Sequence, residues 1–128
     1  MKLLHLHQIE TSIPKLINID LPIKIAYKLN LLLDDINLHL NKLSKFRADF
    51  LTRHGEKTAD GKIKILSSKI QEFDDGMEEL LQEDINIHPV EIPLSLLIEQ
   101  PISFSVLEIE SLKNSGFLID DINSNDNK

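Results

Sequence analysis

The chain has 128 residues, no cysteine and a formal net charge of −7. A chain of this length folds as one domain that needs no disulfide or metal, and the missing cysteines exclude thiolate metal sites and cysteine nucleophiles. Phosphates repel an acidic protein, and no stretch is apolar for long enough to span a bilayer, so we expect neither a nucleic acid nor a membrane partner.

The amino-terminal segment MKLLHLHQIE lacks the long apolar run and the cleavage site of a signal peptide, so we expect a cytosolic protein. Residues Lys2–His7 alternate weakly in polarity, which predicts a short strand with His5 and His7 on one face. Two histidines are too few for a closed metal site, so we expect surface side chains there and no cofactor. A proline after a polar run then predicts a short helix up to Ile19.

Residues Pro22 to His54 predict one long, unbroken amphipathic helix. Pro22 suits the first turn, Asp20 is placed to accept from the free N–H groups, and Gly55 can take the left-handed conformation that ends a helix. Apolar residues recur at heptad spacing, with His39 at the one polar position. The residues in this register are Ile25, Leu29, Leu32, Ile36, Leu43, Phe46 and Phe50.

The apolar stripe of the long helix is wide, because Ala26, Leu33 and Leu40 extend it. One antiparallel neighbour of about sixteen residues would cover only half of its length. Segments 3–19 and 94–117, a second copy of the chain or another protein must therefore cover the rest. The residues that we expect to bind a partner are those of the exposed stripe of the helix, including Tyr27, Leu31 and Leu38.

An Asp-Gly pair at residues 60–61 follows the long helix and predicts a tight turn, with a short strand at Ile63–Ile65 after it. Ser68 and Gln71 have capping-box spacing and predict the start of a second helix. Gly76 costs about 1 kcal/mol inside a helix relative to alanine, so we expect it to allow close approach to another helix. The two helices should pack as an antiparallel hairpin.

The second helix is densely acidic. Residues 56–128 carry six Lys or Arg and sixteen Asp or Glu, whereas residues 1–55 carry eight and five. A hairpin would place these carboxylates beside the basic end of the long helix, although each exposed ion pair contributes only about 0 to 1 kcal/mol. The acidic residues available to a basic partner are Glu72, Asp75, Glu78, Glu79 and Glu83.

Neighbouring carboxylates, such as Asp34 with Asp35 and Asp74 with Asp75, diverge by about 100° on a helix and do not form an acid–base pair. The sequence contains no EF-hand spacing, Walker loop, dinucleotide turn or GxSxG motif. A metal-dependent enzyme would need the scattered histidines and carboxylates to meet in space. We therefore expect no catalytic residue and no enzymatic activity.

Residues Asp84–Pro93 alternate in polarity and contain two prolines, which predicts an edge strand or an extended arm that could pair with residues 62–66. Leu94–Gln100 predicts a single helical turn. Residues 1–119 then make one domain, and residues 120–128 a mobile polar tail.

The last helix is expected to begin at a serine cap, either Ser103 or Ser105. Its apolar stripe contains Val106, Ile109 and Leu112. Gly116 is expected in the left-handed conformation, followed by the apolar Phe117.

These patterns predict a mainly α fold with minor β structure: a long central helix in an antiparallel helical hairpin, a small β element and a C-terminal helix. Four segments resemble a family of small uncharacterised proteins of tailed bacteriophages and prophages. They are LPIKIAYKLN (21–30), GEKTADGK (55–62), MEELLQEDINI (77–87) and ISFSVLEIESL (102–112). The resemblance implies a small accessory or virion-associated protein in the host cytoplasm or the virion, and it brings no catalytic residue.

We therefore expect a non-enzymatic protein that acts by binding a second copy of itself, another phage protein or a host protein. The alternative is an acidic inhibitor that imitates nucleic acid and occupies the basic groove of a host nuclease or defence protein. Salt separates the two, because the mimic would be released as ionic strength rises whereas an apolar interface would not.

Overall fold

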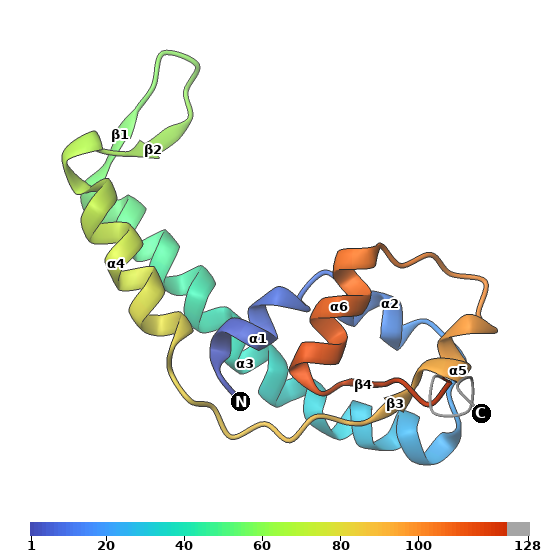
Figure 1. Cartoon of the computed structure of the whole chain (residues 1–128). Coiled ribbons are helices and arrows are strands. Elements are labelled where there is room, and N and C mark those ends of the chain that lie inside the picture. The colour runs from blue at the N-terminus through green and yellow to red at the C-terminus, as the bar shows by residue number, and fades with distance from the viewer. Residues whose placement is uncertain (123–128) are drawn as a thin grey trace.

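The computed structural model describes residues 1–122, and it is mainly α-helical with minor β structure, as the sequence predicts (Figure 1). The elements are α1 (Leu3–Gln8), α2 (Ile13–Ile17), α3 (Ile23–His54), β1 (Gly55–Lys57), β2 (Ile63–Ile65), the 3₁₀ turn η1 (Ser67–Lys69), α4 (Ile70–Leu81), β3 (Ile92–Pro93), α5 (Leu94–Ile98), α6 (Val106–Ser115) and β4 (Leu118–Ile119). The long helix α3 connects two parts of the fold. Its first two thirds line a core with α1, α2 and α6, and its last third forms an arm with α4.

Helix α3 is unbroken over 32 residues, which confirms the predicted central helix. Its buried residues, Leu29, Ile36 and Leu43, are spaced seven apart in the predicted register. Pro22 precedes the first helical residue and the helix ends at His54, as predicted, but the Asp20 cap and the left-handed conformation of Gly55 are wrong. No side chain caps the first turn, so Asp20 does not serve as the cap, and Gly55 is extended (φ −89°, ψ 154°) because the chain runs from the helix directly into β1.

The distal end of the arm is a β-hairpin that projects beyond the helices (Figure 1). Strands β1 and β2 pair antiparallel, with Gly55 opposite Ile65. Gly61 has a φ of +84°, which confirms the predicted turn at residues 60–61. The predicted pairing of this strand with the later extended arm is wrong, since the tight turn brings β1 within reach first.

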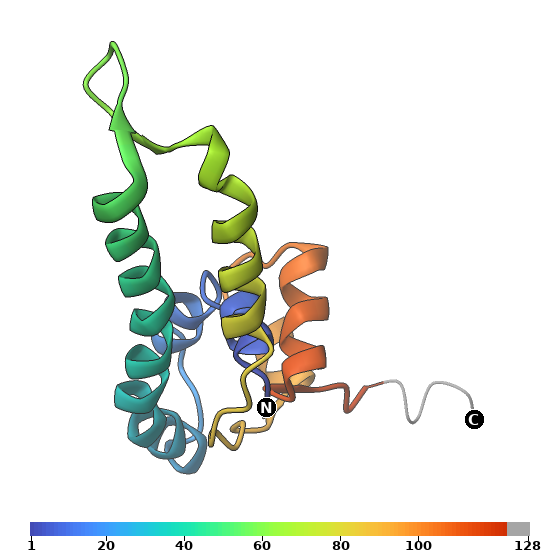
Figure 2. The ribbon, with the colours of Figure 1, turned by 90° about the vertical axis from the view of Figure 1, so that its left-hand side faces the viewer.

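Helices α3 and α4 run antiparallel side by side, as predicted (Figure 2). Phe46 of α3 stacks on Phe73 of α4 with 5.5 Å between ring centroids. A Cβ atom on Gly76 would lie 2.7 Å from Phe46 Cζ, which confirms close helix approach at this glycine. The predicted Ser68 cap is wrong, because α4 begins at Ile70 after the 3₁₀ turn and no side chain caps it.

The first residues of the chain form helix α1, so the predicted strand is wrong. Leu3 and Leu6 are fully buried at a spacing of three, which suits one face of a helix and not one face of a strand. The α1 helix packs on α3 and α6, and the Leu3 N–H donates to Glu83 O (2.9 Å). Segments 3–19 and 94–117 thus supply residues to the core that α3 lines, which is one of the alternatives that the sequence left open.

Residues 84–93 form the predicted extended arm, which lies on the core. Its inward side chains are Ile85, Ile87, Val90 and Ile92. The arm ends in β3, which pairs parallel with β4, so that Ile92 lies opposite Leu118. The predicted single helical turn after it is confirmed as α5.

Helix α6 begins at Ser105, which forms a capping box with Glu108. Gly116 has a φ of +89° and the following Phe117 is fully buried, as predicted. Val106 is wrongly assigned to the apolar stripe, because as the first helical residue it points into solvent. In the predicted tail, Asp121 accepts hydrogen bonds from the backbone and hydroxyl of Ser95 (3.0 and 2.6 Å), and residues 123–128 lie outside the described part of the chain.

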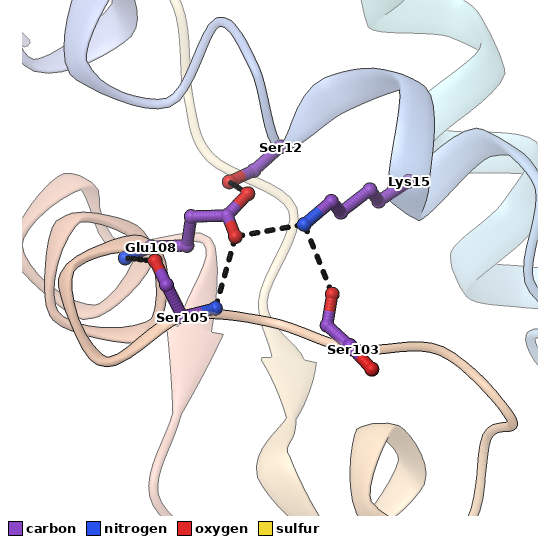
Figure 3. A network of polar contacts seen from close by, with 5 residues as sticks. All are labelled: Ser12, Lys15, Ser103, Ser105 and Glu108. Atoms are coloured by element: carbon purple, nitrogen blue, oxygen red, sulfur yellow. Dashed lines mark hydrogen bonds and ion pairs between the residues drawn. The ribbon is translucent and has the colours of Figure 1, made fainter.

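A polar network joins α2 to the start of α6 (Figure 3). Lys15 Nζ donates to Glu108 Oε1 (2.7 Å) and to Ser103 O (2.9 Å), and the Ser105 N–H donates to Glu108 Oε1 (2.9 Å). The Ser12 hydroxyl, which is fully buried, donates to Glu108 Oε2 (3.3 Å). The hydrogen bond from Lys15, and next that from Ser105, lower the pKa of Glu108 from 4.5 to about 2.

Replacing Glu108 with glutamine should lower the free energy of unfolding by about 1.5 to 3 kcal/mol at neutral pH, because hydrogen bonds to a charged carboxylate are lost. A lowered folded-state pKa stabilises the protein above the unfolded pKa, and this stabilisation disappears as the pH falls from 4.5 towards about 2. Urea unfolding should therefore show the wild type converging on E108Q in acid. The exposed Glu110→Gln is the control, and a difference between wild type and E108Q that persists near pH 2 would contradict the assignment.

Candidate functional site

The outer face of α3 carries four large apolar side chains that no other part of the described chain covers. Ile23, Tyr27, Leu31 and Leu38 are 87%, 63%, 59% and 60% exposed. Spacings of four, four and seven residues place them on one face of a helix. We call this row the outer stripe. In Figure 2 it belongs to the helix at the edge of the molecule, with no other helix beyond it.

The opposite face of α3 holds the outer stripe in place. Leu29, Ile36 and Leu43 anchor that face in the core, and α3 is regular throughout. The helix cannot turn the stripe inward without exposing these buried residues, at a cost of about 1.5 to 3 kcal/mol for each side chain. The outer stripe is therefore a rigid, pre-formed apolar surface, a kind of surface that typically marks a binding site.

A groove borders the outer stripe where the extended arm crosses α3. It encloses about 380 Å³ and is lined by Ile25, Lys28, Leu31, Leu32, His88, Pro89, Val90 and Glu91. Leu31 belongs to both the stripe and the groove, so the two form one continuous surface. A partner that covers the stripe can place a side chain in the groove beside Leu31.

Charged residues on this part of α3 are separated by sign. Lys24 and Lys28 precede Leu31, Asp34 and Asp35 follow it, and all four side chains are exposed. Residues 22–41 contain no other Asp, Glu, Lys or Arg, so their formal charge is zero in a chain whose net charge is −7. The part of this surface that α3 contributes is thus locally neutral, with a basic half and an acidic half.

The acidic residues that sequence analysis singled out are all exposed; Glu72, Asp75, Glu78 and Glu79 lie on α4, and Glu83 follows its end. Lys69 Nζ lies 3.3 Å from Glu72, and Lys42 Nζ of α3 lies 3.5 Å from Glu83. Gln71 donates to Asp75 Oδ1 (2.8 Å). Intramolecular partners therefore already engage part of this acidic face.

The histidines do not assemble into a site. His5 and His7 lie in a helix, where a spacing of two residues separates side chains by about 200°, so the predicted shared face is wrong. His7 Nδ1 lies 3.3 Å from Glu10, and His39 Nδ1 has no hydrogen-bond partner among residues 1–122. No group of three or more His, Asp or Glu side chains within the described residues is arranged to hold a metal ion.

Two parts of the surface were missed by sequence reasoning. Ile23 lies one turn before Tyr27, a signal that the spacing already contained. The groove depends on where the extended arm crosses α3, which no local pattern specifies.

None of the helices in the described region is long and apolar enough to cross a membrane. Comparison of the chain with protein-family models, curated proteins and solved structures found no match.

Proposed function

We propose that this chain is a non-enzymatic interaction protein that binds another protein surface through the outer stripe of α3. The observation that carries the proposal is the exposure of four large apolar side chains on one face of a helix whose other face is core. Burying such a side chain against a partner contributes about 1.5 to 3 kcal/mol. Three of them, Tyr27, Leu31 and Leu38, are the residues that the sequence pattern indicates.

We place the protein among the small accessory or virion-associated proteins of a phage, acting in the host cytoplasm or the virion. Four segments, which lie between residues 21 and 112 and comprise 40 residues in all, support this proposal by their resemblance to such a family. Identifying the proteins that co-purify with the chain from infected cells and from purified virions would test it directly. Recovery of the chain with no phage protein from either source would contradict it.

The double variant Leu31→Glu and Leu38→Glu should lose at least tenfold in partner binding while its helix content and unfolding midpoint stay unchanged. Both side chains are exposed, so the charges disturb a partner and leave the core intact. The matched control is Val106→Glu with Leu107→Glu, two exposed apolar residues at the start of α6. Binding of the wild type and both double variants can be compared by affinity capture with quantitative mass spectrometry. Equal loss in both variants, or in neither, would refute the assignment.

The acidic face of α4 supports the second candidate, an inhibitor that imitates nucleic acid. Its carboxylates are exposed along one helix of a projecting arm (Figure 1). Binding through this face should weaken steeply between about 50 and 500 mM salt and should be lost in Glu78→Gln with Glu79→Gln. Binding through the outer stripe, which rests mainly on the burial of apolar side chains, should weaken much less with salt and should tolerate those two substitutions.

A further inference from the structure

We infer that the partner of the outer stripe is a second copy of this chain, with the two α3 helices packed antiparallel about a two-fold axis near Leu31. This inference rests on the proposed function and specifies its partner. Two observations support it: the separation of charge along α3, and the position of the acidic helix α4 beside one end of α3.

The charge pattern of α3 is complementary to itself in one direction only. The basic half of the stripe carries Lys24 and Lys28, and the acidic half carries Asp34 and Asp35, on either side of Leu31. A two-fold axis near Leu31 brings the basic half of each copy against the acidic half of the other. A parallel pair would instead place lysines beside lysines and aspartates beside aspartates, which is unfavourable.

The apolar residues fit the same arrangement. Tyr27 and Leu38 lie on opposite sides of the axis. Tyr27 of each copy therefore lies towards the end of the interface that contains Leu38 of the other copy. Leu31 lies at the centre, at the edge of the groove between α3 and the extended arm. Tyrosine and leucine anchors surrounded by charged residues are typical of small interfaces between helices.

The position of α4 also favours the antiparallel pair. Helix α4 lies along the second half of α3 only, and it carries much of the net negative charge of the chain (Figure 2). Antiparallel packing places the two acidic α4 helices at opposite ends of the dimer, whereas parallel packing would bring them together. Stable complexes bury roughly 800 Å² per partner, and one pair of helices supplies less, so the dimer should dissociate on dilution.

Sedimentation equilibrium of the full chain from about 1 µM to about 1 mM should show a monomer–dimer equilibrium. Two double variants, Lys24→Glu with Lys28→Glu and Asp34→Lys with Asp35→Lys, should each weaken self-association at least tenfold. In each of them all four charged residues beside the outer stripe have the same sign, so two copies repel each other. An equimolar mixture of these two variants should restore the dimer. The control Val106→Glu with Leu107→Glu should dimerise like the wild type.

Cross-linking tests the direction of packing, because the wild-type chain has no cysteine. Leu31→Cys should form a disulfide-linked dimer on oxidation, since the two copies of residue 31 lie beside the axis. Ile23→Cys should not, because eight residues on each side of the axis separate its two copies by about 24 Å, far beyond disulfide reach. Efficient linkage through both positions would overturn the antiparallel arrangement.

A wild-type chain that stays monomeric up to 1 mM, or charge variants that dimerise as well as the wild type, would overturn the inference. A monomeric chain could still bind another protein through the outer stripe. The capture experiment with the Leu31→Glu and Leu38→Glu double variant tests that proposed function separately. Far-ultraviolet circular dichroism of every variant establishes that a loss of association is not a loss of folding.

Discussion

Replacing Ile36 with alanine should lower the free energy of unfolding by about 2 to 5 kcal/mol, whereas Leu38→Ala should change it by less than about 0.5 kcal/mol. The two residues lie two positions apart in α3 but on opposite faces. Ile36 is fully buried in the core, and Leu38 belongs to the outer stripe. Removing the Ile36 side chain leaves a cavity among close-packed neighbours, while shortening Leu38 mainly exposes less apolar surface to water.

Urea unfolding of the wild type and both variants, followed by circular dichroism, would measure this difference. The protein must be dilute enough to be monomeric, so that an interface formed by Leu38 does not add to its stability. Similar losses in the two variants would mean that α3 has no free face, and the binding surface proposed for it would not exist.

Gly76→Ala should destabilise the protein by about 1 to 3 kcal/mol, although alanine is favoured over glycine in a helix by about 1 kcal/mol. A Cβ atom at this position would lie 2.7 Å from Phe46 Cζ, well inside contact distance. The Phe46 ring must therefore move, and in doing so it disturbs its contacts with Phe73 and Phe50. These rings hold the first turns of α4 against the end of α3.

The double variant Gly76→Ala with Phe46→Leu separates the clash from other effects of the new methyl group. It should be less destabilised than the sum of the two single variants, since leucine leaves room for the alanine. Thermal unfolding monitored by circular dichroism gives the comparison, with the exposed Asp74→Ala as the helix-propensity control. A Gly76→Ala variant more stable than the wild type would show that α3 and α4 do not approach as closely as described.

The sequence pattern predicted the long elements of this fold well, because long elements repeat their signals. Helix α3 repeats its buried positions over three heptads, and Leu29, Ile36 and Leu43 all point into the core as expected. Helix α6 is marked at both ends, by Ser105 at its start and by Gly116 at its end. Short elements carry too few residues to distinguish a strand from a helix. Lys2–His7 alternates over only six residues and forms α1 instead.

The predictable part of the candidate site is likewise the part that lies on a long, periodic element. Tyr27, Leu31 and Leu38 lie on the face opposite the buried register, so periodicity alone identifies them as exposed apolar residues. The groove beside Leu31 depends on His88–Glu91 crossing α3, a contact between segments far apart in the chain. Gly55 directly follows the end of α3, as predicted, but it is extended and not left-handed, because it pairs with Ile65 in the hairpin.

Tyr27 is the only tyrosine of the chain, which contains no tryptophan, so its fluorescence reports on the outer stripe directly. Acrylamide quenching of this fluorescence over a range of protein concentrations tests whether the outer stripe is open in one copy and covered on binding. In dilute protein we predict that acrylamide quenches Tyr27 nearly as well as it quenches free tyrosine. Quenching should decrease as the protein concentration rises, and it should not decrease in Leu31→Glu. A tyrosine already shielded in the most dilute protein, or equally quenched at every concentration, would contradict this result.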